Sequence, residues 1–144
     1  MIRLLPILLF AAFFWSVLFG DRQFGYRDGA HFYYPLYRYV QEELAAGRLP
    51  LWNPYENLGQ PLAANPTTAL FYPGKLIFLL PIDFTTAYHW FTATHVLLAA
   101  FLAYRLVRAW RCSKEAAVLA GICYAFGGNV LFQHSNVPFL IGAA

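Results

Sequence analysis

Asp28 is the side chain of this sequence best placed for chemistry, because it is a lone carboxylate about eight residues beyond an apolar N-terminal segment. It lies in the string GYRDGAHFYYP, among aromatic residues and glycines. A carboxylate within hydrogen-bond distance of a substrate hydroxyl can accept its proton as a general base. The same residue could instead cap a helix that begins at Gly29, and the residues alone leave both roles open. Asp21 is a competing carboxylate, which we expect to end the first helix.

Three basic side chains are candidates to bind an anionic group of a substrate. Arg27 and His31 flank Asp28, and Lys75 is the one charged residue in the apolar run Phe71–Leu80. A lone lysine at membrane depth favours an anionic partner, although its ammonium group can also reach the lipid headgroups. Arg27 and His31 could contact a phosphate or a sugar, but residues of these types in such a loop are more often solvated.

The sequence does not indicate a metal or a disulfide. His89 and His95 are six positions apart, so they lie about 120° apart on a helix and do not form a metal pair. We expect a structural hydrogen bond for His95. Cys112 and Cys123 are separated by about 16 Å of expected helix, which is too far for a disulfide. No cofactor is predicted, and a divalent metal is possible without being indicated.

The composition is that of a membrane protein. The 144 residues are 60% hydrophobic and 12% charged, about half the charged fraction of a typical soluble domain. The net charge of +3 is spread too thinly for a nucleic-acid surface, so nucleic acid is not an expected partner, whereas the lipid bilayer is.

Apolar runs predict three transmembrane helices, at residues 2–20, 85–108 and approximately 115–134, with a long connection at 21–83. The first run could also be a cleaved signal peptide, although Leu18 is bulky for the cleavage site. The chain stops inside an apolar stretch. We therefore expect the N-terminal part of a longer protein, with a small complete three-helix protein as the alternative.

The connection should be structured. Leu36, Val40 and Leu44 recur at helical spacing, and they predict a helix from about Tyr34 to Ala46 at the membrane interface. Pro35 fits its first turn and Gly47 the position just after its end. Prolines at 50, 54, 61 and 66 exclude a continuous helix or central strand beyond it, so an ordered irregular loop is expected.

Charge bias predicts the orientation. Arg105, Arg108, Arg111 and Lys114 cluster after the second predicted span, which is typical of a cytoplasmic turn, and Arg3 agrees. The N-terminus is then cytoplasmic, and the connection 21–83 faces outward.

The residues GRLPLWNPY at 47–55, GQPL at 59–62 and FYP at 71–73 resemble the first outer loop of bacterial YfhO-type membrane proteins. The similarity extends over roughly residues 20–144. That family is similar to the GT-C class of membrane glycosyltransferases, which use polyprenyl-phosphate-linked sugars outside the membrane. The resemblance implies an all-α polytopic, GT-C-like membrane protein in the bacterial plasma membrane.

The resemblance further implies a function and roles for the candidate residues. Asp28 would be the general base that activates an extracytoplasmic acceptor, and Lys75, Arg27 and His31 would contact the polyprenyl-phosphate-linked donor. GT-C loops often carry two adjacent acids, whereas here Gly29 follows Asp28. The alternative function is a non-catalytic transporter or flippase subunit.

Overall fold

The computed structural model describes residues 5–144, and its regular structure is almost entirely helical, which confirms the all-α class. The elements are α1 (Leu5–Leu18), the π-helical turn η2 (Gly29–Tyr33), α2 (Tyr34–Ala45), β1 (Trp52–Asn53), β2 (Gln60–Pro61), the 3₁₀ segments η3 (Pro66–Thr68) and η4 (Pro73–Leu79), α3 (Phe84–Ala109), α4 (Lys114–Ala125), α5 (Gly128–Phe132), the 3₁₀ turn η5 (Gln133–Ser135) and α6 (Val137–Ala143).

Two helical segments are long and apolar enough to cross a membrane, namely α3 and the stretch Lys114–Ser135. The second contains a break at Gly127, whose backbone is extended between α4 and α5. The described part of α1 has 14 residues, or about 21 Å of helix, which is shorter than a typical span. The start of the first predicted span, residues 2–4, lies outside the described residues. The prediction of three membrane-length helices is therefore confirmed for two.

Helices α3 and α4 form an antiparallel hairpin with close backbone contact. Asp83 is the N-cap residue of α3, and its Oδ2 accepts a hydrogen bond from the Thr86 amide at 3.2 Å. A Cβ on Gly121 of α4 would lie 2.6 Å from the carbonyl oxygen of Ala100. Small residues allow such helices to approach closely in a membrane, where van der Waals packing replaces the hydrophobic effect.

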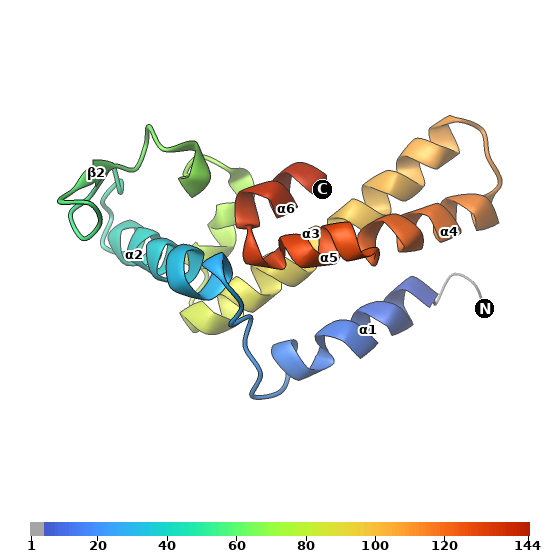
Figure 1. Cartoon of the computed structure of the whole chain (residues 1–144), viewed down its shortest axis with the longest axis horizontal. Helices are drawn as coiled ribbons and strands as arrows, with labels where there is room; N and C mark the ends of the chain where they lie inside the picture. The colour runs from blue at the N-terminus through green and yellow to red at the C-terminus, as the bar shows by residue number, and fades with distance from the viewer. Residues whose placement is uncertain (1–4) are drawn as a thin grey trace.

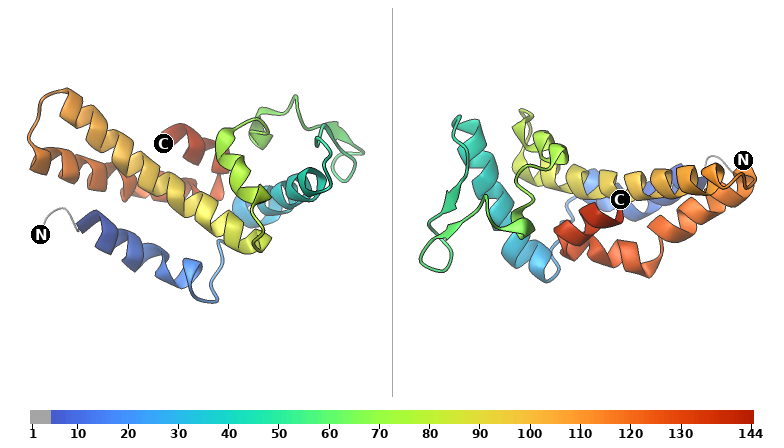
Figure 2. Two further views of the ribbon diagram at one scale, coloured as in Figure 1. Left: turned by 180° about the vertical axis from the view of Figure 1, so that it is seen from behind. Right: turned by 90° about the horizontal axis from the view of Figure 1, so that it is seen from above.

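The long connection and the basic turn lie at opposite ends of α3. Segment 21–83 gathers around the first turns of α3, whereas the turn between α3 and α4 is at the far end (Figures 1 and 2). Helix α1 runs beside the hairpin, and its last turn is at the end where the connection begins (Figure 1). This arrangement is compatible with the orientation predicted from the charge bias, which stays a prediction.

Helix α2 matches its prediction closely. Leu36 and Val40 are buried, Leu44 is partly buried, and all three belong to one core cluster. Gly47 has a φ of +72° just beyond the helix end, a conformation that glycine adopts without steric cost. The proline-rich loop contains a small antiparallel pairing that the sequence did not predict, with Trp52 opposite Pro61 and Asn53 opposite Gln60.

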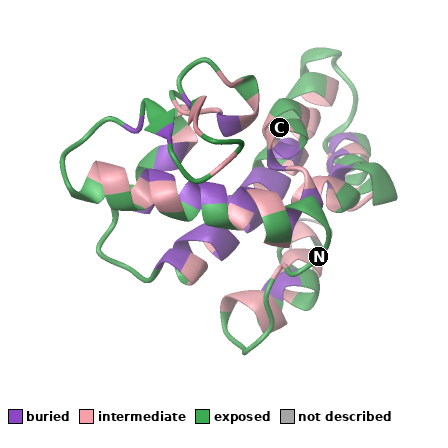
Figure 3. Cartoon of the chain, turned by 60° about the vertical axis from the view of Figure 1, so that its left-hand side comes forward, coloured by how far each residue is buried: buried purple, intermediate pink, exposed green. Residues whose placement is uncertain are grey.

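Two buried clusters hold the structure together, and Figure 3 shows the buried residues in purple among the partly and fully exposed ones. The first cluster joins η2, α2, η4 and the start of α3. The second joins α1, the middle of α3, α4, α5 and α6. Ile7, Trp15, Phe101, Leu106 and Leu119 each expose more than half of their surface. An apolar exterior on long helices is expected where lipid is the solvent.

Candidate functional site at the Asp28 turn

Asp28 lies at the start of an unusual backbone turn. Arg27 has a φ of +48°, which is uncommon for a residue with a side chain, and the π-helical turn η2 follows Asp28 directly. π-Helical turns are rare and are found frequently at functional sites. The backbone therefore departs from regular geometry where the sequence places its best candidate for chemistry.

Contacts with later parts of the chain fix this turn in place. Gly29 packs against the backbone of Ser135, because a Cβ at Gly29 would lie 3.3 Å from the Ser135 Cα. The Tyr88 hydroxyl of α3 donates a hydrogen bond to the Gly29 carbonyl oxygen at 3.3 Å. The Tyr33 hydroxyl donates to Oδ1 of Asn136 at 2.8 Å. Segments more than 50 residues away thus hold the backbone that carries Asp28.

The Asp28 side chain itself is exposed and makes no capping hydrogen bond, so the structure does not support the role of a simple helix cap. Its negative charge acts on Tyr33: burial, and secondarily the nearby Asp28 carboxylate, raise the pKa of the Tyr33 hydroxyl. Asp28 lines none of the hollows described below, but it lies between two of them along the chain.

An apolar hollow of about 350 Å³ opens beside the turn, between α1, α3 and α5. It is lined by Phe13, Phe14, Phe24, Val96, Gly128, Leu131, Phe132 and His134. His134 is the one titratable residue of this lining. Its backbone oxygen would lie 3.5 Å from a Cβ on Gly29, which places the polar end of the hollow directly against the Asp28 turn.

Aromatic contacts connect Arg27 to this polar end. The Arg27 guanidinium lies 5.7 Å from the ring centre of Tyr26, and that ring lies 6.4 Å from the His134 ring. Nδ1 of His134 is 2.7 Å from the Leu131 carbonyl oxygen, which requires a proton on Nδ1. Nε2 has no hydrogen-bond partner among residues 5–144, so it is free to contact an added group.

His31 faces a different hollow from the one beside Asp28. This aromatic hollow, of about 330 Å³, lies between α2 and the β1–β2 hairpin. Its lining comprises His31, Phe32, Pro35, Leu36, Tyr39, Asn53, Tyr55 and Glu56. His31 is three residues from Asp28, so the same turn contributes to both regions.

Lys75 does not join Asp28, Arg27 or His31. It is 3% exposed, and its Nζ lies 2.9 Å from the ring centre of Tyr37, with no hydrogen-bond partner in the described chain. Burial lowers the pKa of the Lys75 amine to about 6. A phosphate contact by Lys75 would require this packing to open, and the role predicted from the sequence stays a prediction.

The remaining polar candidates have structural surroundings. His95 contacts the Tyr72 hydroxyl through Nε2 at 2.8 Å and the Phe91 carbonyl oxygen through Nδ1 at 2.6 Å, which confirms the expected structural hydrogen bond. Asp21 lies beyond the end of α1, in a shallow polar hollow that it shares with Asp83. Within residues 5–144, no group of three or more His, Cys, Asp or Glu side chains is placed to hold a metal ion.

Sequence reasoning missed His134, Tyr33 and Asn136, which the fold brings to the Asp28 turn. No local signal could have revealed them, because Tyr33 and Asn136 are 103 residues apart in the chain. The chain matches no protein-family model, no curated protein and no solved structure.

Proposed function

We propose that this chain belongs to a membrane glycosyltransferase that moves a sugar from a polyprenyl-phosphate donor to an extracytoplasmic acceptor. The observation that carries the proposal is the position of Asp28. Its carboxylate is exposed and makes no capping hydrogen bond, and it belongs to a turn that long-range contacts hold in place. An apolar hollow with a polar end opens beside that turn.

The apolar hollow suits the lipid part of such a donor. Its walls are mainly aromatic and aliphatic, and its polar end carries His134, whose ring lies 6.4 Å from the Tyr26 ring that the Arg27 guanidinium contacts. An amphiphile with an isoprenoid tail and a phosphate head needs this order of groups, since the tail requires apolar contacts and the phosphate requires cations or N–H donors. In the proposal Arg27 and the imidazole of His134 contact the phosphate.

Asp28 then acts as the general base. The acceptor hydroxyl oxygen attacks the anomeric carbon of the donor sugar while its proton passes to the Asp28 carboxylate. The bond between the anomeric carbon and the phosphate oxygen breaks, polyprenyl phosphate leaves from the opposite face, and the configuration at that carbon inverts. Arg27 and His134 stabilise the negative charge that develops on the leaving phosphate.

Membrane topology fits this chemistry. The two membrane-length helices support a membrane protein, and the basic residues at the α3–α4 turn favour the cytoplasmic side for that turn. The Asp28 turn is then on the outer side of the plasma membrane, where polyprenyl-phosphate sugars are consumed in the class that the sequence resembles.

The test compares Asp28→Asn with Asp21→Asn in the full-length protein, using bacterial membrane vesicles and a radiolabelled polyprenyl-phosphate sugar. Both changes remove one exposed carboxylate from the same segment. Loss of a general base should lower transfer by roughly 10²–10⁴-fold in Asp28→Asn and leave Asp21→Asn unchanged. Donor binding should survive in both variants. A folded Asp28→Asn protein with full transfer activity would refute the assignment.

A further inference from the structure

The aromatic hollow between α2 and the β1–β2 hairpin plays no part in the mechanism above, although its lining combines aromatic rings with hydrogen-bonding groups. Its volume of about 330 Å³ is at the lower end of the range for small-molecule sites, about 300–1,000 Å³. All of its lining residues belong to segment 21–83, and none belongs to the apolar helices α1, α3 and α4. Its occupant therefore comes from the aqueous side.

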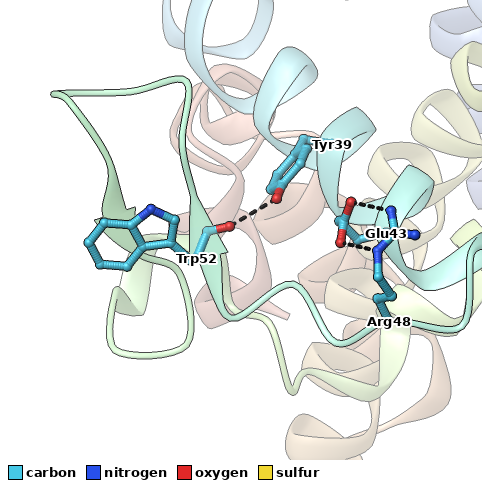
Figure 4. A network of polar contacts seen from close by, with 4 residues as sticks. All are labelled: Tyr39, Glu43, Arg48 and Trp52. Carbon is cyan, nitrogen blue, oxygen red and sulfur yellow. Dashed lines mark hydrogen bonds and ion pairs between the residues drawn. The ribbon is translucent and has the colours of Figure 1, made fainter.

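Tyr39 and Tyr55 supply aromatic walls of the hollow. The centres of their rings lie 5.5 Å apart, and the rings are nearly perpendicular, at 85°. Tyr55 is 83% exposed, an unusual state for a large ring on an ordered segment. The face of an aromatic ring carries partial negative charge, so it attracts the weakly positive C–H groups of a sugar ring. Tyr39 is fixed in orientation, because its hydroxyl donates to the Trp52 carbonyl oxygen at 2.9 Å (Figure 4).

Glu56 supplies a carboxylate that is held in place yet incompletely used. Its Oε2 accepts hydrogen bonds from Gln60 Nε2 at 2.6 Å and from Asn53 Nδ2 at 3.3 Å. Its Oε1 has no partner among the described residues. Asn53 is 5% exposed, and its Oδ1 accepts from the Tyr55 amide at 3.0 Å. One carboxylate oxygen therefore remains free to accept a hydrogen bond from a hydroxyl group.

The charge of the hollow selects against anions. Its lining contains Glu56 and no arginine or lysine. The two arginines of α2 and the following turn are paired elsewhere, Arg38 with Glu42 at 3.1 Å and Arg48 with Glu43 at 2.7 Å (Figure 4). A phosphate or carboxylate ligand would meet an unneutralised negative charge, whereas neutral hydroxyl groups would find an acceptor.

Hydrogen bonds to α2 hold the hairpin beside the hollow. The turn after Glu56 is made by Asn57, Leu58 and Gly59, which have positive φ angles of 51°, 63° and 103°. The bond from Tyr39 to Trp52 attaches the hairpin to α2, and the pair of Arg48 with Glu43 holds the chain that leads from α2 to the hairpin (Figure 4). A preformed site avoids the cost of ordering its side chains when the ligand binds.

We propose that this hollow binds a neutral carbohydrate, with the sugar face on Tyr55 and a sugar hydroxyl donating to Oε1 of Glu56. His31, at the edge nearest Asp28, contacts the sugar unit that approaches the turn. The identification of this carbohydrate as the acceptor rests on the proposed transferase function, whereas its binding does not. The acceptor itself is then neutral and meets the negative charge of Glu56, in contrast to the donor phosphate, which meets Arg27.

The test is a binding measurement that needs no turnover. The full-length protein, labelled with a fluorophore in lipid nanodiscs, is applied to a glycan array that contains neutral and acidic oligosaccharides. The variants are Tyr55→Ala, Glu56→Gln and Asp28→Asn. Phe71→Ala is the matched control, since Phe71 is a 73% exposed aromatic residue of the same segment that lies outside the hollow.

Wild type and Phe71→Ala should retain the same neutral glycans. Tyr55→Ala should bind them about tenfold more weakly through loss of the ring contact, and Glu56→Gln should also bind them more weakly. Retention of acidic glycans only, of no glycan, or of the same glycans by Tyr55→Ala and wild type would overturn the inference. Asp28→Asn should bind glycans as wild type does. If Asp28→Asn loses transfer activity but the wild-type protein retains no glycan, only this inference is refuted. If the wild-type protein retains neutral glycans but Asp28→Asn transfers sugar normally, only the proposed function is refuted.

Discussion

Lys75 offers a quantitative test of the packing around α2, because it is a buried amine without a compensating hydrogen bond. Its Nζ lies over the Tyr37 ring, and the Phe78 ring centre is 5.7 Å away. The Tyr37 hydroxyl is also buried without a partner, and burial raises its pKa. Both groups are therefore uncharged in the folded protein at neutral pH.

The consequence for stability follows from proton binding. The Lys75 amine has a pKa of about 6 in the folded chain, against an ordinary value of 10.5. Between these values the unfolded chain binds a proton that the folded chain lacks, so the free energy of unfolding rises with pH by about 1.4 kcal/mol per pH unit. Across the whole window the penalty is on the order of 6 kcal/mol, fully present below pH 6 and absent above pH 10.5.

Lys75→Met removes the titrating group and keeps a long, flexible side chain that can contact the Tyr37 ring through its sulfur. At pH 7 we expect the variant to be several kcal/mol more stable than wild type, since it avoids most of this penalty. Unfolding would be followed by circular dichroism during SDS titration of the detergent-solubilised protein, at intervals from pH 6.5 to 9.5. The difference between wild type and variant should shrink steadily as the pH rises.

Lys114→Met is the matched control, because Lys114 is exposed at the start of α4 and is the other lysine of the sequence. It should keep the pH dependence of wild type. A Lys75→Met protein that is less stable than wild type at pH 7, with an unchanged dependence on pH, would refute the reasoning. That result would mean that the amine is charged and paired, as the phosphate contact predicted from the sequence requires.

Two further predictions concern the contacts that position the site. Gly121→Leu should lower stability in the same SDS titration by about 1–3 kcal/mol or more, since its Cβ would lie 2.6 Å from the Ala100 carbonyl oxygen. Gly142→Leu is the control, because no atom lies within 4 Å of a Cβ at that position. Equal effects of the two substitutions would contradict the close packing of α3 and α4. Tyr33→Phe should cost about 1 kcal/mol by removing the hydrogen bond to Asn136. In a double-mutant cycle with Asn136→Ala the two effects should be non-additive, and full additivity would show that the bond does not hold the turn.

Hydrophobic spacing and end signals in the sequence were sufficient to predict helices α2 and α3. The spacing of Leu36, Val40 and Leu44 predicted α2, and Pro35 and Gly47 marked its ends to within a residue. The uncharged run before Arg105 predicted α3 with similar accuracy. The break at Gly127 could not be placed as securely, because glycines within an apolar run can be accommodated in a helix or interrupt it.

The orientation of side chains was the part that sequence could not provide. Lys75 in an apolar run is compatible with a lipid headgroup, a ligand or the protein interior, and only the structure shows that its amine lies buried over the ring of Tyr37 on α2. His134 could not be interpreted because its neighbours, Phe24 and Tyr26, are more than 100 residues away. Such contacts depend on how the helices pack, which a single sequence does not specify.

The Asp28 turn has a geometry that suits a reaction of two substrates better than the binding of one. Gly29 and Tyr33 attach it to η5 and the following asparagine, next to the apolar hollow, whereas His31 and Phe32 of the same turn line the aromatic hollow. A lipid-binding subunit that only moves its cargo needs the first of these surfaces, but it has no need of a polar, negatively charged second one. A transferase requires a base that reaches both a lipid-linked donor and a hydroxylated acceptor, and the turn that carries Asp28 lines one of these hollows and packs beside the other, as the proposed transferase would require.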